Sequence, residues 1–227
     1  MNISSDTVIF DLDGTLIESE QIWGEVRKGF VTENGGHWVA DAQSAMIGMR
    51  TAEWATYIQE KLGVALSPDD IAQRVVAIVV ERLKEPPVLP GADAALKRLV
   101  RVFPLGLASS ASLPVAKTVL AVTGWDRLFS VVVSADEVPR GKPAPDVYLR
   151  ALELLNADAA RTAAIEDSAN GIRSGDAAGL SVIAIPNREF PPDAGALSLA
   201  ARILANLDGL DEAVVRSVLR VPQSQGP

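Results

Sequence analysis

Two carboxylates separated by one residue are the clearest chemical signal in the chain. Asp11 and Asp13 follow the apolar run Thr7 to Phe10 and lead into a turn at Gly14. Two like charges about 4 Å apart repel by about 4 kcal/mol at an effective dielectric constant of about 20. The pair therefore costs free energy unless a cation, a shared proton or a reaction intermediate lies beside it. Asp11 and Asp13 could also be ordinary turn residues, so the segment predicts chemistry only if other residues join it.

More polar side chains lie near the ends of other predicted elements. They supply hydroxyl and amide donors for a phosphoryl group, one cation, and two carboxylates that suit a hard divalent metal ion. Each alone could be a helix cap, a turn residue or a solvated side chain. Their joint appearance favours a site that binds a metal ion and a phosphoryl group. These residues are Ser109, Ser110, Lys142, Glu166 and Asp167.

The elements that must position these residues form an α/β pattern. Five short apolar runs predict buried parallel strands, and helical patterns separate the later ones, which is typical of a doubly wound parallel sheet. In such a sheet, ligands bind beyond the carboxyl ends of the strands, near the point where strand order reverses. The predicted strands cover residues 7–10, 105–108, 131–133, 163–165 and 182–185, and the predicted helices between them cover residues 112–122, 145–156 and 168–178.

The stretch between the first two predicted strands is too long for a simple crossover and is mostly helical in pattern. Helices are expected at about residues 18–32 and 51–62, and a third begins at Ser67, where a serine cap, a proline and acidic residues agree. The predicted organisation is a core domain of residues 1–15 and 89–227 with an inserted α-helical cap domain of residues 16–88. The two connections between them permit a hinge.

Composition excludes several classes of function. The chain has 227 residues and a formal charge of -8, which argues against general binding to nucleic acid or to an anionic membrane. It has no cysteine, which removes disulfides, thiolate nucleophiles and sulfur-ligated metal sites. No apolar stretch is long enough to span a bilayer, and no secretory signal is visible. These observations allow a cytoplasmic location, and we expect a cytoplasmic monomer that acts on a small molecule.

Two competing binding motifs fail on spacing. An EF-hand beginning at Asp11 needs glycine at its sixth position and glutamate at its twelfth, but Gly14 is fourth and Ile22 is twelfth. A nucleotide-binding P-loop needs a glycine five residues before Gly141, where Asp136 stands. Calcium buffering and nucleoside-triphosphate switching therefore lose support.

The motifs, in their order, resemble those of the haloacid dehalogenase superfamily over essentially the whole chain. The matching segments are Asp11-Leu12-Asp13-Gly14-Thr15, Ser109, Lys142 within Gly-Lys-Pro-Ala-Pro-Asp, and residues 165–172. The resemblance is strongest to the beta-phosphoglucomutase-like branch, whose small helical cap lies between the first and second motifs, as residues 16–88 do here. It implies a Rossmann-like core under that cap.

This resemblance implies a Mg2+-dependent phosphatase. Asp11 is the nucleophile that forms an aspartyl-phosphate, and Asp13 protonates the leaving alcohol and then activates water. Ser109 and the Ser110 amide hold phosphoryl oxygens, and Lys142 helps neutralise charge as the carboxylate attacks an anionic group. Ser109, Ser110 and Lys142 are therefore also expected to bind the substrate.

The same resemblance implies the metal ligands. Mg2+ is expected on the Asp11 side chain, the Asp13 backbone carbonyl and Asp167, with Glu166 as a direct or water-mediated partner. Thr15 supports the turn and is counted with the substrate site. Acid catalysis requires Asp13 to hold a proton that Asp11 lacks, so we expect their surroundings to drive their pKa values apart.

Asp13 also distinguishes activities within the superfamily, because dehalogenases lack an aspartate at this position. The hexose-phosphate mutases of this branch carry a histidine ten residues after the acid-base aspartate, where this chain has Trp23. We therefore expect a phosphatase acting on a small phosphorylated metabolite, with a hexose-phosphate mutase as the alternative. A phospho-accepting signalling domain shares the aspartates, hydroxyl, lysine and Mg2+, but needs neither Asp13 nor the cap.

The cap is expected to contribute substrate specificity. Arg50 follows Gly48 and Met49 between two predicted helices, and similar loops in this branch face the substrate. We hypothesise that Arg50 contacts a polar or anionic part of the substrate, and the ordinary alternative is an exposed arginine at a helix start. Trp23 is expected to line the substrate pocket. Trp54 is a weaker candidate for the same wall, and aromatic residues of small helical domains more often belong to the apolar core.

Overall fold

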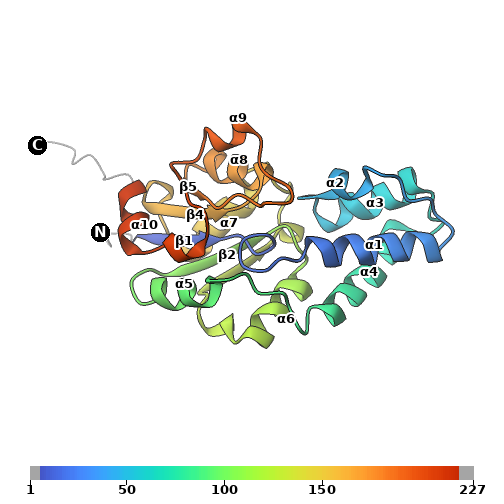
Figure 1. Ribbon diagram of the computed structural model, residues 1–227, viewed down its shortest axis with the longest axis horizontal. Helices are drawn as coiled ribbons and strands as arrows, with labels where there is room; N and C mark the ends of the chain where they lie inside the picture. The colour runs from blue at the N-terminus through green and yellow to red at the C-terminus, as the bar shows by residue number, and fades with distance from the viewer. Residues whose placement is uncertain (1–5, 220–227) are drawn as a thin grey trace, which may run out of the picture.

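A six-stranded parallel sheet forms the centre of the protein (Figure 1). The computed structural model describes residues 6–219, so the outer ends of the predicted core domain lie outside the described residues. The sheet order is β3-β2-β1-β4-β5-β6, and every neighbouring pair is parallel. The strands are β1 (Thr7–Phe10), β2 (Leu105–Ser109), β3 (Val131–Ser134), β4 (Thr162–Glu166), β5 (Ser181–Ala184) and β6 (Arg202–Ile203).

The predicted fold class is confirmed, and the first five strands lie within one residue of their predicted ends. The sequence prediction missed β6, which has two residues, both exposed. So short a strand shows neither an apolar run nor an alternating pattern.

Helices cover both faces of the sheet. Because successive side chains of a strand point to opposite faces, Val8 and Phe10 join one apolar cluster with α5, α6 and α10, whereas Ile9 joins the other with α7 and α8. Within residues 6–219, every helix is too short or too polar to cross a lipid bilayer. The helices of the core are α5 (Ala92–Leu99), α6 (Leu113–Thr123), α7 (Asp146–Leu155), α8 (Ala169–Ala177), α9 (Ala194–Leu197) and α10 (Glu212–Val218).

Four helices of the insert lie together at one end of the sheet (Figure 1). They are α1 (Glu20–Glu33), α2 (Ala42–Met46), α3 (Thr51–Leu62) and α4 (Pro68–Arg82). The predicted ends of α3 match the structure, and Ser67 caps α4 by accepting a hydrogen bond from the Asp70 backbone at 3.1 Å. Ile58 and Val75 are fully buried between these helices. The short helix α2 was not predicted, because five residues give little periodic signal.

The two connections between insert and sheet run side by side. The Glu18 N–H donates to the Pro87 carbonyl at 2.8 Å, and the Leu89 N–H donates to the Leu16 carbonyl at 2.9 Å. Ile17 and Val88 form an antiparallel bridge between them. The chain therefore leaves and re-enters the core at one place.

Candidate active site

The predicted carboxylates meet where strand order reverses. β1 pairs with β2 on one side and with β4 on the other, and the chain crosses β1 to reach β4. Asp11 follows β1, and its N–H donates to the Ile165 carbonyl of β4 at 3.0 Å. Asp167 lies directly beyond the carboxyl end of β4. Residues far apart in sequence thus share the crevice in which ligands of such sheets bind.

Two glycines allow the carboxylates to approach the backbone this closely. Gly14 has a φ of +80°, and a Cβ there would lie 2.0 Å from Asp167 Oδ2. A Cβ on Gly171, in the first turn of α8, would lie 1.8 Å from Glu166 Oε2. Any larger side chain at either position would displace a carboxylate of the site.

Lys142 joins two of the carboxylates in the interior of the site. Its Nζ donates to Asp11 Oδ1 at 2.6 Å and to Glu166 Oε1 at 2.5 Å. The Tyr148 hydroxyl, on α7, donates to the same Glu166 oxygen at 2.6 Å. All four side chains are buried, so charge compensation inside the cluster is what makes their burial tolerable.

Burial raises the pKa of both aspartates of the first motif. It raises the pKa of Asp11 to about 8, although the positive charge of Lys142 opposes the shift. It also raises the pKa of Asp13, against hydrogen bonds from Ser19, Trp23 and Ser109. Because the two shifts have the same sign, burial alone does not provide the separation of pKa values that we expected from the sequence.

Three carboxylates form a group that could hold a metal ion. Oxygen atoms of Asp11, Glu166 and Asp167 lie within 4.8 Å of one another. Asp167 Oδ1 is buried and has no hydrogen-bond partner. Burial, with the negative charges of Asp11 and Glu166, raises the pKa of Asp167 well above its usual range. A closely spaced all-oxygen set with an unpaired buried oxygen suits a hard divalent cation.

Asp13 lies on the other side of Asp11, toward the cap. The Ser19 hydroxyl donates to Asp13 Oδ1, and the Ser109 hydroxyl lies 3.4 Å from Asp13 Oδ2. Ser109 Oγ also accepts the Ala111 N–H at 3.0 Å. Ser19 was not singled out from the sequence. Its position just before α1 shows that the start of the cap helps to orient Asp13.

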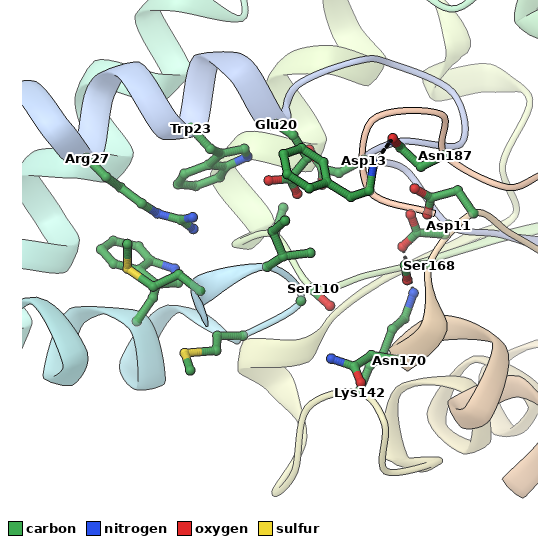
Figure 2. Close-up of a pocket in the computed structure, with 18 residues that line it drawn as sticks. Asp11, Asp13, Glu20, Trp23, Arg27, Ser110, Lys142, Ser168, Asn170 and Asn187 are labelled. Atoms are coloured by element: carbon green, nitrogen blue, oxygen red, sulfur yellow. Dashed lines mark hydrogen bonds and ion pairs between the residues drawn. The ribbon is translucent and has the colours of Figure 1, made fainter. Parts of the chain in front are cut away.

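A cavity of about 60 Å³ lies between the core and the cap (Figure 2). A volume of this size holds a few water molecules. Its lining includes most of the predicted catalytic and metal-binding residues together with a face of the cap. The core contributes Asp11, Asp13, Ser110, Lys142 and Asp167, and the cap contributes Glu20, Trp23, Arg27 and Trp54.

The remaining predicted residues do not line this cavity. Ser109 and Glu166 lie behind it and contact Asp13 and Lys142. Thr15 lines a separate cavity, and its buried hydroxyl has no hydrogen-bond partner. The structure therefore does not bring Thr15 into the pocket with the other predicted substrate-binding residues.

Arg50 does not line the cavity. Its Nε donates to Glu53 at 3.2 Å, and its Nη1 donates to the Val138 carbonyl of the core at 3.4 Å. It thus joins the cap to the core segment that precedes Lys142. The expected contact between Arg50 and the substrate finds no support in this position.

The sequence reasoning missed two charged residues of the cap face. Glu20 and Arg27 flank Trp23 along α1, and all three line the cavity (Figure 2). Positions 20, 23 and 27 follow the three-four spacing of one helix face. This periodic signal was available once the helix and Trp23 had been recognised.

Comparison with known proteins identifies the family. Residues 5–179 match the model of the haloacid dehalogenase-like hydrolases. The chain belongs to this family.

Relatives in this family include named phosphatases. A bifunctional riboflavin kinase/FMN phosphatase of Arabidopsis thaliana is 33% identical over 81% of this chain, which spans about half (49%) of that protein. Hexitol phosphatase B of Escherichia coli K12 is 30% identical over 82% of this chain and 85% of its own length. The phosphatase assignment made from Asp13 agrees with these relatives, and the chain is an enzyme that hydrolyses phosphomonoesters.

Solved structures confirm the fold. CbbY from Rhodobacter sphaeroides, in complex with phosphate, has a TM-score of 0.83 and 26% identity over 93% of this chain and 99% of its own. A beta-phosphoglucomutase from Clostridium difficile has a TM-score of 0.81 over 95% of this chain and 97% of its own. At 20% identity the second likeness concerns the fold alone. The beta-phosphoglucomutase-like fold expected from the sequence is therefore confirmed.

Proposed function

We propose that the protein is a Mg2+-dependent phosphatase of small phosphorylated metabolites that works through an aspartyl-phosphate on Asp11. The observation that supports this proposal most directly is the arrangement at the carboxyl ends of the strands. There Asp11 lies next to both Lys142 and Asp167, and Asp13 lines the same cavity beneath the cap. These are the groups that phosphoryl transfer to a carboxylate requires.

The reaction is divided between the two aspartates. An Asp11 carboxylate oxygen attacks phosphorus, the bond from phosphorus to the leaving oxygen breaks, and Asp13 gives that oxygen a proton. In the second step Asp13 takes a proton from water, the water oxygen attacks phosphorus, and the bond to Asp11 breaks to release phosphate. The raised pKa of Asp13 suits the first role, because a group that keeps its proton near neutral pH can act as an acid.

Lys142 and the segment after β2 would hold the phosphoryl group. Lys142 Nζ already lies 2.6 Å from the attacking carboxylate, so its charge is in place for the anionic oxygens. The Ser109 hydroxyl and Ser110 amide supply further donors at the same strand end. Because these groups are fixed by the fold before substrate arrives, little reorganisation accompanies the reaction.

The carboxylates fit a magnesium ion. Asp11 and Asp167 would hold it, with the Asp13 carbonyl, and the unpaired buried Oδ1 of Asp167 supports this assignment. The cation would supply charge neutralisation that favours the ionised form of Asp11 and offsets the anionic phosphoryl group. Glu166 is engaged with Lys142 and Tyr148, which supports an indirect role for it at the metal.

The cap would open to admit substrate. The cavity of about 60 Å³ is smaller than a sugar phosphate, and cap residues form its roof. The paired connections at residues 16–18 and 87–89 are the places where such a motion would begin. Closing the cap would then exclude bulk water from the phosphoryl site.

Phosphate release from a broad panel of sugar, polyol and nucleotide monophosphates tests this proposal. The wild-type protein is expected to release phosphate with Mg2+ and to lose that activity with a chelator. Asp11→Asn should lower turnover by several orders of magnitude, and circular dichroism checks that the variant stays folded with Glu166 as the remaining partner of Lys142. Activity that survives either the substitution or the chelator would contradict the mechanism.

A further inference from the structure

A buried cation in the cap, Arg27, forms no ion pair with any carboxylate in the described part of the chain. Arg27 is 5% exposed. Its Nε is buried without a hydrogen-bond partner. Burial lowers the pKa of Arg27 to about 10, so the side chain keeps its charge near neutral pH. A permanent charge with free donors is therefore present in the wall of the pocket.

The guanidinium of Arg27 lies against the faces of two indole rings. Arg27 Cζ lies 4.6 Å from the ring centre of Trp23 and 5.0 Å from that of Trp54. Cation–π contacts of this kind leave the N–H groups unpaired and only partly offset the lost hydration of the charge. The indoles therefore fix the position of Arg27 without satisfying its hydrogen-bonding capacity.

Glu20, the carboxylate on the same face of α1, is hydrogen-bonded to a residue other than Arg27. Glu20 Oε2 accepts a hydrogen bond from Gln43 Nε2 at 3.0 Å, and attraction between Glu20 and Arg27 acts only through space. Arg27 points along the pocket in the direction of Glu20 and the phosphoryl site (Figure 2). Its donors are thus directed at a space that substrate can enter.

We propose that Arg27 binds an oxyanion at the far end of the substrate, so that preferred substrates are phosphomonoesters with a second phosphate or a carboxylate. This inference rests on the proposed phosphatase function and names the substrate class of that same site. Arginine suits the role because its planar donors pair two at a time with phosphate or carboxylate oxygens.

Arg27 lies in the cap wall of the pocket, opposite the reacting carboxylate of the core. Arg27 is seven residues beyond Glu20, which places it about 10 Å further along the axis of α1. Asp11 and Arg27 line the same cavity from opposite sides, one in the core and one in the cap. The far anion therefore belongs at the cap end of the substrate, and a linear five-carbon chain serves as a probe that separates it from the reacting phosphate.

Three synthetic substrates test the proposal with the full chain. They share a linear carbon skeleton and differ in the far group: 5-hydroxypentyl phosphate, pentane-1,5-diyl bisphosphate and 6-(phosphooxy)hexanoate. The wild-type protein is expected to prefer the two anion-ended compounds, and their relative efficiencies distinguish phosphate from carboxylate. Arg27→Gln should lower kcat/KM for the anion-ended compounds by about tenfold or more, mainly through KM. It should change the neutral-ended compound by less than about threefold, within the small effects of uninvolved polar groups.

Two further variants separate substrate binding from packing. Arg27→Lys keeps the charge and should restore part of the preference. Arg74→Gln makes the same charge change at an exposed position of α4 and should leave all three substrates unaffected. Equal use of the three substrates by the wild-type protein would overturn the proposal, as would an equal loss on all three in Arg27→Gln.

A failure of the proposed phosphatase function can be told apart from a failure of the inference on Arg27. If the wild-type protein hydrolyses none of the compounds, the proposed function fails, and calorimetric titration of the bisphosphate decides the inference on Arg27. Binding to the wild-type protein that weakens by about tenfold in Arg27→Gln would support it. Equal binding by both proteins, or binding by neither, would contradict it.

Discussion

The two cations that face the pocket, Lys142 in the core and Arg27 in the cap, are held in opposite ways. Lys142 contacts two carboxylates at 2.5 and 2.6 Å, whereas Arg27 lies against the faces of two indole rings and forms no ion pair within residues 6–219. Both side chains are almost completely buried. The core thus satisfies its charge within the fold, and the cap leaves its charge for a ligand. This difference separates groups that carry out a fixed reaction from groups that select the molecule undergoing it.

Replacing Lys142, the cation of the core, should have the largest effect on both stability and activity. Lys142→Met leaves Asp11 and Glu166 buried without their counter-ion, so we expect the free energy of unfolding to fall by about 3 to 5 kcal/mol and phosphatase activity to be lost. Chemical denaturation at neutral pH measures the first effect. Lys142→Met combined with Glu166→Gln should regain part of the stability because one unpaired charge is removed. A loss below about 1 kcal/mol in the single variant would show that the pair does not behave as a buried one.

Removing the tyrosine behind the core cation should have a smaller effect. Tyr148→Phe keeps the buried ring but removes its hydrogen bond to Glu166, which should cost about 1.5 to 3 kcal/mol of stability. Lys142 keeps both of its carboxylate partners, so kcat should fall much less than in Lys142→Met. A kcat loss as large as that of Lys142→Met would mean that Tyr148 itself contacts the reacting groups.

Titration of Glu20, the buried carboxylate of the cap, should make the free energy of unfolding depend on pH. Burial raises the pKa of Glu20 to about 7, so the folded protein retains a proton that the unfolded chain releases above about pH 4.5. Stability from this group is therefore full below about pH 4.5 and decreases as the pH rises to about 7. Glu20→Gln should become progressively more stable relative to wild type across that window and then level off. Denaturation curves measure this, and Glu60→Gln, at an exposed position of α3, should show no such trend.

Arg50 should give the smallest effect. Its partly exposed contacts with Glu53 and the Val138 carbonyl join cap and core, so Arg50→Ala should change kcat/KM by less than about fivefold. The change should be the same for neutral-ended and anion-ended substrates. A KM increase confined to anion-ended substrates would restore Arg50, rather than Arg27, as the residue that recognises the far group.

The core chemistry was predictable from sequence because it depends on strand ends. Parallel strands bring their carboxyl ends to one edge, so Asp11 after β1 and Asp167 after β4 were expected to meet in space. Lys142 was instead expected there as the cation just before a helix and as part of the family's motifs. Tyr148 escaped notice because a buried aromatic residue on a helix is usually core, and only the position of Glu166 gives its hydroxyl a partner.

The cap was harder to predict, since its function depends on how helices face one another. The ends of α3 were predicted, and Gly48 and Met49 of the loop before it line the cavity as expected, but the Arg50 side chain contacts Glu53 and Val138 instead. The role of Arg27 follows from helix periodicity combined with the packing of Trp23 against Trp54, at 6.0 Å between ring centres. Periodicity can be read from sequence, but that packing between two helices cannot.

The paired connections between cap and core have a consequence for how such enzymes can be altered. Because Leu16 and Leu89 are hydrogen-bonded neighbours, the two chain connections between insert and sheet meet at one point. A replacement segment need only bring its two ends together there, and insertion at adjacent chain ends is the kind that folds tolerate best. The helical insert is therefore suited to replacement as a unit. Such a replacement would change which substrates are accepted while leaving the nucleophile of the core unchanged.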